Sequence, residues 1–362
     1  MLPFAELSAH ISDINKFIAE VHPRHFSPDY LSLTSGKISY CNLSKDLDAS
    51  LAQPNWDMLD RSKSYLRPLV FLAIIGGLGK DPKDFVKYAS LLELIHNGTL
   101  IHDDIEDYAK KRRGDKPIYI KYGLDIAVNS ANLMYFTPLL MFKKYAHEMP
   151  DNIRLQAYEV LVEHLNRVTW GQALDIYWHR NSKIPSIKEY LQMCCYKTGA
   201  IDRMVSSLAT VLTQTDDSTT NMLKEFGEKL GICLQIHDDF SDVCTMDRKL
   251  IGEKDIGNDI TEGKKSLVNI IALLNLEEKD RQLLINILLE HTSDSERIKT
   301  ALNLIEKSDA LSQVLSFAEK EFNHLKKIIV AILNEKYSSM IGSFIDAMVR
   351  DMKLKYEQRV VK

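Results

Sequence analysis

The stretch PKDFVKYASLLELIHNGTLIHDDIED, from Pro82 to Asp107, decides the fold class. Its apolar residues recur at helical spacing, at Phe85, Ala89, Leu92 and Ile95. The preceding Asp81 suits a helix N-cap, and proline is favoured at a first helical position. We therefore predict one long helix over residues 82–107.

The rest of the chain follows the same pattern. Glycine (15) and proline (10) are scarce among the 362 residues, and alternating β-branched residues are rare. The sequence SIKE at 186–189 is a capping box that opens another helix. We predict an all-α fold and a single domain over 1–362. It would comprise an N-terminal helical extension at 1–55, a core at 56–275 and C-terminal packing helices at 276–362.

Charge and cysteine content exclude several classes of protein. The net charge of −4 gives no basic field for a nucleic acid. No run of 18 uncharged apolar residues predicts a membrane span, and the N-terminus does not resemble a signal peptide. The five cysteines are odd in number and lack framework spacing, which predicts reduced thiols in a soluble, cytoplasmic protein.

An acidic cluster ends the predicted helix. His96, Thr99, Asp103 and Asp107 share one helical face, and Asp104 lies at its edge. Like charges one turn apart destabilise a helix, whereas a cation bound between them reverses that effect. Ligands that are all oxygen suit Mg²⁺. A solvated helix end, neutralised by the basic residues 110–113, is the alternative at this point.

A second acidic cluster repeats the first 135 residues later, at Asp238, Asp239 and Asp242. Two glycines on the same face, Gly227 and Gly231, each cost a helix about 1 kcal/mol, and their small size would leave room beside it. Two such clusters suit several Mg²⁺ ions that clamp a polyphosphate. Basic residues that could bind phosphate oxygens lie near the motif-like segments: Arg67, Arg112, Arg113, Lys197, Lys254 and Lys264.

Over roughly residues 60–270 the sequence resembles the trans-isoprenyl diphosphate synthase family, also called polyprenyl synthetases, and in particular its geranylgeranyl and longer-chain members. The matching motifs, in family order, are KSYLRP (63–68), ELIHNGTLIHDDIEDYAKKRRG (93–114), GQALD (171–175), YKTGA (196–200), LQIHDDFSDV (234–243) and KDIGNDITEGKKSL (254–267). The resemblance implies a homodimer in which long helices surround a central apolar cavity. It also implies condensation of an allylic diphosphate with isopentenyl diphosphate.

The resemblance assigns a role to individual residues. Metal ligands for about three Mg²⁺ ions would be Asp103, Asp104, Asp107 and Asp238, with Asp239 and Asp242 assisting. Contacts to the allylic diphosphate would come from Arg112, Lys197 and Lys264, and contacts to isopentenyl diphosphate from Arg67, His96 and Arg113. The developing cation would be lined by Gln172, Thr198 and Gln235. Lys254 belongs to the trailing lysine segment, which would bind substrate. A transient membrane contact is compatible with long products.

Two sequence features distinguish this chain from other members of the family. Ser64 stands where the family has a lysine, so Lys63, one residue earlier, is the candidate to replace it. Gly98 and Thr99 stand where bulky aromatics would stop chain growth, and we therefore predict a product of geranylgeranyl length or longer. A lower floor would come from Leu94, Ile95, Met134, Tyr135 or Phe136.

Two other functions remain as alternatives. A class I terpene cyclase shares the fold and the first motif, but its second metal motif normally mixes Asn, Ser or Thr with Glu. A non-catalytic subunit of a heteromeric synthase typically loses aspartates that are present here. We expect Lys265, beside Lys264, to be solvated.

Overall fold

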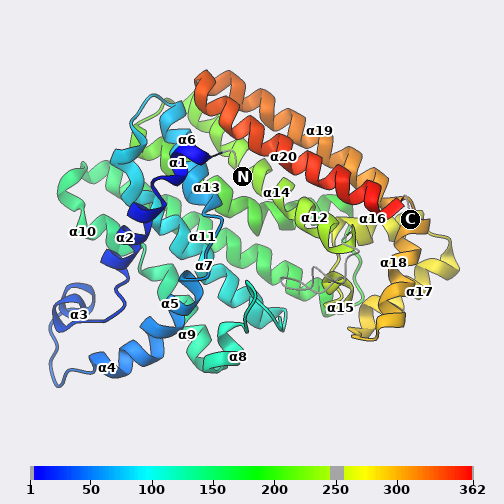
Figure 1. Cartoon of the computed structure of the whole chain (residues 1–362), viewed down its shortest axis with the longest axis horizontal. Coiled ribbons are helices and arrows are strands. Elements are labelled where there is room, and N and C mark those ends of the chain that lie inside the picture. Colours follow the sequence, from blue (N-terminus) through cyan, green and yellow to red (C-terminus); the bar gives the residue numbers. More distant parts are fainter. Residues whose placement is uncertain (1–3, 245–256, 361–362) are drawn as a thin grey trace. The chain divides into compact units, whose positions relative to one another are not determined.

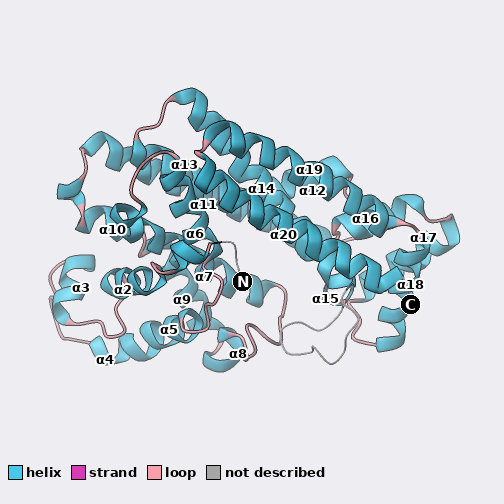
Figure 2. Cartoon of the chain, turned by 45° about the horizontal axis from the view of Figure 1, so that its top comes forward, coloured by secondary structure: helices cyan, strands magenta, loops and turns pink. Residues whose placement is uncertain are grey.

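The computed structural model describes residues 4–244 and 257–360, and these are helical almost throughout, with no β-strand (Figures 1 and 2). The predicted all-α class is confirmed. Contacts within the chain group the residues into two compact units. Among the described residues, one unit comprises 4–161 and 208–214, and the other comprises 162–207, 215–244 and 257–360. The single domain with internal boundaries near residues 55 and 275 stays a prediction.

The first unit holds the helices of the N-terminal half. They are α1 (Ala5–Ser8), α2 (Ile11–Val21), α3 (Pro28–Ser35), α4 (Ser44–Leu47), the π-helix η1 (Asp48–Ala52), α5 (Gln53–Leu59), α6 (Leu66–Gly77), the 3₁₀-helix η2 (Pro82–Phe85), α7 (Val86–Glu106), α8 (Ile118–Tyr122), α9 (Leu124–Phe136), α10 (Leu139–Lys144) and the 3₁₀-helix η3 (Ala146–Glu148). Two long helices, α11 (Asp151–His179) and α13 (Thr198–Thr213), each contribute residues to both units.

The second unit holds the remaining helices. They are α12 (Ile187–Tyr196), α14 (Asp217–Cys244), α15 (Asn258–Thr261), α16 (Leu267–Asn275), α17 (Glu278–Glu290), α18 (Ser295–Lys307), α19 (Ala310–Ile332) and α20 (Glu335–Val360). Within this unit α14 packs against α12, α19 and α20.

Helix α7 is the centre of the first unit. It packs against α2, α6 and α9, and most of its side chains are buried, which is typical of a helix surrounded by others. The Asp81 carboxylate accepts a hydrogen bond from the Lys83 amide (3.0 Å), so the predicted N-cap is confirmed. The first turn, Pro82–Phe85, is a separate 3₁₀ turn, and the α-helix ends at Glu106, one residue before Asp107.

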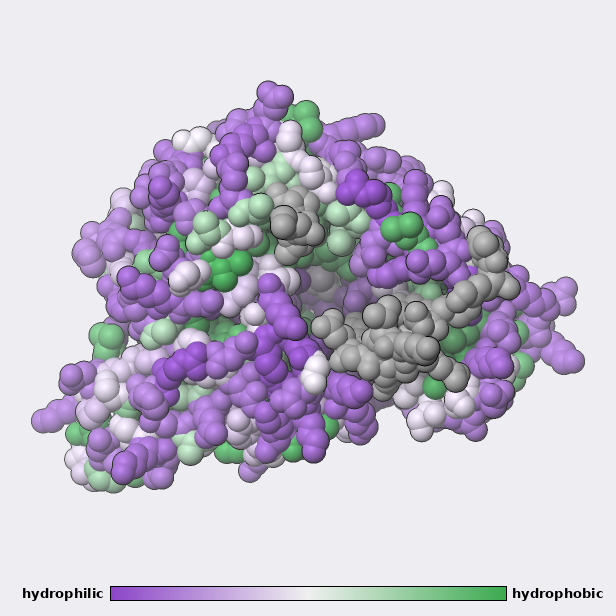
Figure 3. All heavy atoms as spheres, in the orientation of Figure 1, coloured by the Kyte–Doolittle hydropathy of each residue, from purple (hydrophilic) through white to green (hydrophobic). Residues whose placement is uncertain are grey.

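The capping box at the start of α12 is also confirmed. The Ser186 hydroxyl accepts from the Glu189 amide, and the Glu189 carboxylate accepts from the Ser186 amide at 2.8 Å. Among the described residues no helix is long and apolar enough to cross a membrane. On the face drawn in Figure 3, hydrophilic residues cover most of the described surface and apolar residues form small separate groups.

Candidate active site

The first acidic cluster lies at the C-terminal end of α7. The Arg112 guanidinium donates to the Asp104 carboxylate (Nε–Oδ1 2.7 Å) and reaches Asp103 (3.3 Å). The Asp104 side chain is 1% exposed, against 27% for Asp103. Burial raises the pKa of Asp104 to about 6, although the Arg112 charge opposes the shift. Helix C-termini disfavour negative charge, so this placement costs stability in the absence of a bound cation.

The Asp104 carboxylate has one oxygen atom that could bind a metal ion. Its Oδ2 atom is buried and makes no hydrogen bond. A buried carboxylate oxygen without a partner is costly, and a cation would satisfy it. Among the described residues no three acidic, imidazole or thiol side chains form a closed metal site. Mg²⁺ binds through one or two carboxylates and completes its shell with water and substrate phosphates, and the unsatisfied Asp104 oxygen beside Asp103 offers such carboxylates. The residues present therefore fit Mg²⁺.

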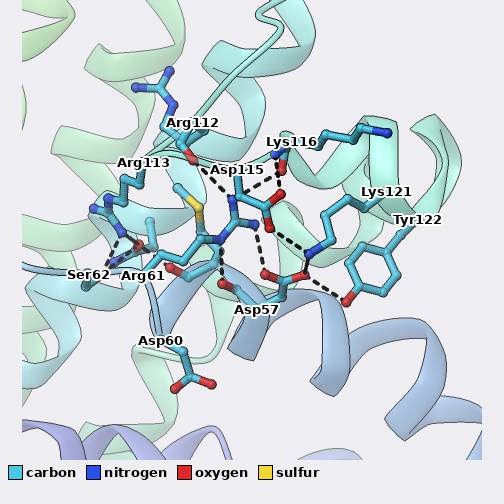
Figure 4. A network of polar contacts seen from close by, with 12 residues as sticks. Asp57, Asp60, Arg61, Ser62, Arg112, Arg113, Asp115, Lys116, Lys121 and Tyr122 are labelled. Carbon is cyan, nitrogen blue, oxygen red and sulfur yellow. Dashed lines mark hydrogen bonds and ion pairs between the residues drawn. The ribbon is translucent and has the colours of Figure 1, made fainter. Parts of the chain in front are cut away.

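A tight turn after α7 carries the two arginines. The backbones of Arg112 and Asp115 exchange hydrogen bonds of 2.8 and 3.2 Å. Arg112 points toward the acidic cluster, whereas Arg113 donates to the Ser62 hydroxyl (2.7 Å) and to the Asn97 side-chain oxygen (2.8 Å). Figure 4 shows the two side chains leaving the turn in different directions. The turn thus presents its two guanidinium groups to different surroundings.

Arg67 and His96 form a direct contact in the same unit. The Arg67 guanidinium donates to the His96 ring, with 3.0 Å between Nη1 and Nδ1. Burial lowers the pKa of His96 well below its usual range, and the charges of Arg67 and Arg113 add to the effect. His96 is therefore a neutral acceptor and Arg67 the charged group. The structure brings together the three residues predicted to bind isopentenyl diphosphate.

The predicted chain-length residues lie against α9. A Cβ atom built on Gly98 would lie 3.0 Å from the Met134 Cβ and 3.1 Å from the Tyr135 ring. The space beside Gly98 is thus taken by Tyr135, and burial together with the Glu106 and Asp103 charges raises the pKa of its hydroxyl. Phe136 is 65% exposed on the same helix. A role for Gly98 and Thr99 in chain length stays a prediction, and Tyr135 is the side chain that such a role would involve.

The second acidic cluster lies on α14 in the other unit. Asp238 is exposed, whereas Asp239 and Asp242 are buried. The Asp239 carboxylate accepts from the Tyr190 hydroxyl (2.6 Å) and the Gln235 amide (2.8 Å). The Asp242 carboxylate accepts from the backbone amides of residues 258 and 259, at 3.2 and 3.1 Å. The role of Asp239 and Asp242 as assisting residues stays a prediction.

Several of the residues predicted to line the cation or to contact the allylic diphosphate lie in the same unit as this cluster, whereas Arg112 lies at the first cluster. The Thr198 hydroxyl donates to the Gln235 side-chain oxygen (2.7 Å), and Gln235 in turn contacts Asp239. Lys197 pairs with the buried Asp175 (2.6 Å). Burial would raise the pKa of Asp175, but the Lys197 and Lys264 charges bring it below its usual value. Gln172 is half-buried on α11.

The room expected beside Gly227 and Gly231 is filled by protein. A Cβ on Gly227 would lie 2.4 Å from the Asp202 carbonyl oxygen, and a Cβ on Gly231 would lie 2.5 Å from that of Thr198. Both glycines therefore allow the α13 backbone to approach α14. This close approach positions Thr198 against Gln235.

Gly231→Ala tests this packing. The added methyl group would overlap backbone atoms of Thr198 and Gly199, so the helices must separate. We expect a loss of about 1–3 kcal/mol in the free energy of unfolding, measured by urea denaturation. Gly342→Ala is the matched control, because its nearest neighbour would be the end of the Lys326 side chain at 3.9 Å. An unchanged stability for Gly231→Ala would contradict the close approach.

In the trailing lysine segment, the burial of Lys265 differs from the prediction. Lys264 pairs with Glu262 (2.6 Å), but Lys265, expected to be solvated, is only 4% exposed and donates to the Gly263 carbonyl. Burial lowers the pKa of Lys265 to about 8. Lys254 lies outside the described residues, and Lys63 is exposed between α5 and α6.

Sequence reasoning missed Asp259 and Tyr190. Asp259 is buried with a side-chain oxygen that makes no hydrogen bond. Burial, with the charges of Asp242 and Asp239, raises the pKa of Asp259 well above its usual range. The spacing after the second cluster gave a signal for Asp259, since it lies five residues before Lys264 in the matched motif. No local signal marks Tyr190.

Comparison with known proteins gives concordant matches. The family model described as polyprenyl synthetase matches residues 48–305. A short chain isoprenyl diphosphate synthase of Methanocaldococcus jannaschii is 32% identical over 270 residues, which cover 73% of this chain and 78% of that protein. A geranylgeranyl pyrophosphate synthase of Dictyostelium discoideum is 32% identical over 247 residues, covering 68% of this chain and 75% of that protein.

Solved structures share the fold. A geranylgeranyl pyrophosphate synthetase from Pyrococcus horikoshii Ot3 superposes with a TM-score of 0.82 at 24% identity, covering 96% of this chain and 98% of that one. A decaprenyl diphosphate synthase from Rhodobacter capsulatus gives a TM-score of 0.79 at 18% identity, with 97% and 98% covered. These two likenesses concern the fold alone.

Proposed function

The chain belongs to the polyprenyl synthetase family and is a trans-prenyltransferase, and we propose that its two acidic clusters serve one Mg²⁺-dependent condensation. The observation that carries the proposal is the buried, unsatisfied Asp104 oxygen beside Asp103 and the Arg112–Arg113 turn. Such a cluster needs cations, and a diphosphate brings them with it. Family membership is the support for assigning both clusters to the same diphosphate.

The substrates are an allylic diphosphate and isopentenyl diphosphate, and the product is of geranylgeranyl length or longer. Bound at these carboxylates, Mg²⁺ would neutralise the diphosphate and make it a better leaving group. Arg112, Lys197 and Lys264 would contact the allylic diphosphate while its carbon–oxygen bond breaks. Arg67 and Arg113 would hold isopentenyl diphosphate so that its double bond attacks the allylic cation. The neutral His96 would accept from Arg67 and fix its orientation.

Thr198 and Gln235, which adjoin the second cluster through Asp239, would contribute dipoles to the site. Thr198 and Gln235 are joined by a hydrogen bond, so their oxygens are positioned before reaction and would stabilise the developing cation. We propose that the proton released after bond formation passes to the departing diphosphate. Catalysis then consists of electrostatic stabilisation and positioning.

A single assay tests the proposed function. Purified protein is incubated with Mg²⁺, isopentenyl diphosphate and each allylic primer in turn, and the product mass is read out. We expect chain extension only when isopentenyl diphosphate is present. Conversion of geranylgeranyl diphosphate alone would instead indicate a terpene cyclase, and inactivity of the single chain would indicate a non-catalytic subunit.

Mg²⁺ alone should stabilise the protein in a pH-dependent manner. The pKa of Asp104 is about 6 in the folded protein, whereas an aspartate in the unfolded chain loses its proton near pH 4. Between about pH 4 and pH 6 the folded protein therefore holds one more proton than the unfolded chain. The stability of the metal-free protein falls as the pH rises through this range. Mg²⁺ needs the ionised form. We expect the rise in melting temperature caused by saturating Mg²⁺ to be about 5 °C above pH 7 and to shrink as pH falls through 6.

The control for this measurement is Asp104→Asn, which removes the titrating group. Its Mg²⁺-induced shift should be small and should not change between pH 5.5 and 7.5 (values roughly either side of the Asp104 pKa). Asp46→Asn alters an exposed aspartate on α4 and should behave as the wild type. A wild-type shift that is independent of pH would argue against Asp104 as a ligand.

We also propose a homodimer. Three exposed apolar residues lie on one face of α11: Val162 (53% exposed), Trp170 (55%) and Tyr177 (64%). Exposed apolar residues gathered on one helix face are typical of a protein interface. The interface would bury the Trp170 indole, a side chain that often dominates such contacts.

Trp170→Glu should weaken the dimer. Burial of an unpaired charge and loss of the indole are expected to cost about 2 kcal/mol or more in association free energy. Sedimentation analysis over a range of protein concentrations measures this change. Leu354→Glu, at an exposed position on α20, is the matched control and should leave the association unchanged. Equal dissociation constants for the two variants would contradict the proposed interface.

A further inference from the structure

Arg61 makes contacts that the proposed reaction does not use. It follows α5, and its side chain is only 13% exposed. Its Nε donates to the Asp57 carbonyl (2.8 Å), and its Nη2 pairs with the Asp57 carboxylate (3.0 Å). A buried arginine that holds a carboxylate from its own chain segment has a fixed orientation. The rest of its guanidinium group is therefore directed at a defined target.

That target is the backbone of the turn after α7. The Arg61 Nη1 atom donates to the carbonyl oxygens of Arg112 and Lys116, each at 3.1 Å (Figure 4). These two carbonyls lie on either side of the residues that reverse the chain. One guanidinium nitrogen thus bridges the two arms of the turn.

The turn needs such support because its backbone is unfavourable. Arg113 has φ 51° and Gly114 has φ 81°, as in the two-residue turns that normally place Asn or Gly first. An arginine in the left-handed region costs about 1 kcal/mol or more. External hydrogen bonds to the flanking carbonyls keep this conformation populated.

Asp57 anchors the bridge to a second helix. Its Oδ2 atom contacts the Lys121 ammonium (2.6 Å) and accepts from the Tyr122 hydroxyl (2.9 Å), both on α8. Lys121 also pairs with Asp115, the last residue of the turn (3.0 Å). Figure 4 shows that these side chains converge on Asp57 from one side while Arg61 approaches from the other. The turn is therefore held at both ends.

Arg113 lies between the two residues, Arg112 and Lys116, whose carbonyl oxygens Arg61 bridges, so its backbone position follows that bridge directly. The Arg112 side chain is independently fixed by the Asp104 carboxylate. The Arg113 side chain is aimed by its backbone toward Ser62, the residue next to Arg61. If the turn relaxed, the Arg113 guanidinium would be displaced from the position opposite Asn97.

We propose that Arg61, anchored by Asp57, is a positioning residue that holds Arg113 in place to bind isopentenyl diphosphate. The inference rests on the proposed function of Arg113. It assigns to Arg61 an effect on the affinity for one of the two substrates, exerted through the backbone of the turn and without contact to the diphosphate.

The test is a double-mutant cycle with Arg61→Gln and Arg113→Gln. Arg113→Gln should raise the KM for isopentenyl diphosphate about 10- to 100-fold, because a charged hydrogen bond is lost. Arg61→Gln should raise the same KM about tenfold and change the KM for the allylic substrate less. The double variant should resemble Arg113→Gln alone, since Arg61 acts through Arg113. Arg61→Lys cannot bridge both carbonyls while it holds Asp57, and should fall between wild type and Arg61→Gln.

Arg24→Gln is the matched control. Arg24 also makes a bidentate ion pair, to Asp60, but its side chain is half-exposed and does not touch the turn. It should leave both KM values unchanged. Multiplicative KM effects in the double variant, or an unchanged KM in Arg61→Gln, would overturn the inference. An unchanged KM in Arg113→Gln would instead overturn the function proposed for Arg113.

Discussion

Asp103→Asn is expected to lower kcat by about 10²–10³-fold, the loss typical of removing one group that stabilises charge in a transition state. Asn keeps the size of the side chain and removes its charge. Asp103 is the more accessible of the two adjacent aspartates, and Arg112 lies 3.3 Å from it. A carboxylate in this position can take a metal without first being freed from the protein interior.

Initial rates with saturating Mg²⁺, isopentenyl diphosphate and an allylic primer measure this effect. Asp46→Asn serves as the control for the substitution itself, and the melting temperature of each variant shows whether the fold is retained. Because Asp103 repels its neighbours, Asp103→Asn should be at least as stable as the wild type without metal. Near wild-type turnover in Asp103→Asn would remove this carboxylate from the metal site.

The helix that carries the acidic cluster could be predicted because its signals are local. The N-cap Asp81, the proline after it and the apolar spacing all act within a few residues of one another. The helix ends at Glu106, and Tyr108, two residues later, has a positive φ of 53°. The family motifs also led to both acidic clusters, whose roles stay predictions.

Packing partners could not be predicted in the same way. Helical periodicity tells which direction Gly98, Gly227 and Gly231 face, but not what occupies that direction. A glycine beside an open cavity and a glycine that lets another helix pack closely cannot be distinguished from the sequence. Here the neighbours are Tyr135 in one case and the α13 backbone in the other.

Adjacent lysines present the same difficulty. Lys264 and Lys265 are chemically identical, and nothing in their local sequence distinguishes them. The structure pairs the first with Glu262 and buries the second, which donates to a backbone carbonyl. Burial of this kind depends on tertiary contacts made by distant segments, as it does for Asp259.

The contacts that Arg61 makes with the turn could not be predicted from the sequence either. The Arg-Gly pair at 113–114 is a recognisable turn signal. Its dependence on Arg61 and Asp57 is not, because those residues lie about fifty positions earlier in the chain. A motif identifies the groups that touch a substrate more readily than the groups that hold them in place.

Tyr135→Ala is expected to lengthen the product by at least one isoprene unit. Tyr135 lies beside Gly98. Gly98 precedes Asp103 by five residues, and along a helix this separates the two residues by about 7–8 Å. Its ring also lies 5.3 Å from that of His102, between centroids. A growing chain that starts at the diphosphate near Asp103 and follows α7 would meet this ring. Truncation to alanine would remove the obstruction.

Phe136→Ala is the matched control, since this neighbouring ring is 65% exposed and should not affect product length. Truncation of Tyr135 is expected to cost about 3 kcal/mol, so the melting temperature is measured with the product masses. Gly98→Phe should destabilise the protein, because α9 already occupies the space that the new ring would need. If Tyr135→Ala keeps the wild-type product while Gly98→Phe folds and shortens it, the limit to chain growth lies at Gly98, and the ring of Tyr135 moves aside during elongation.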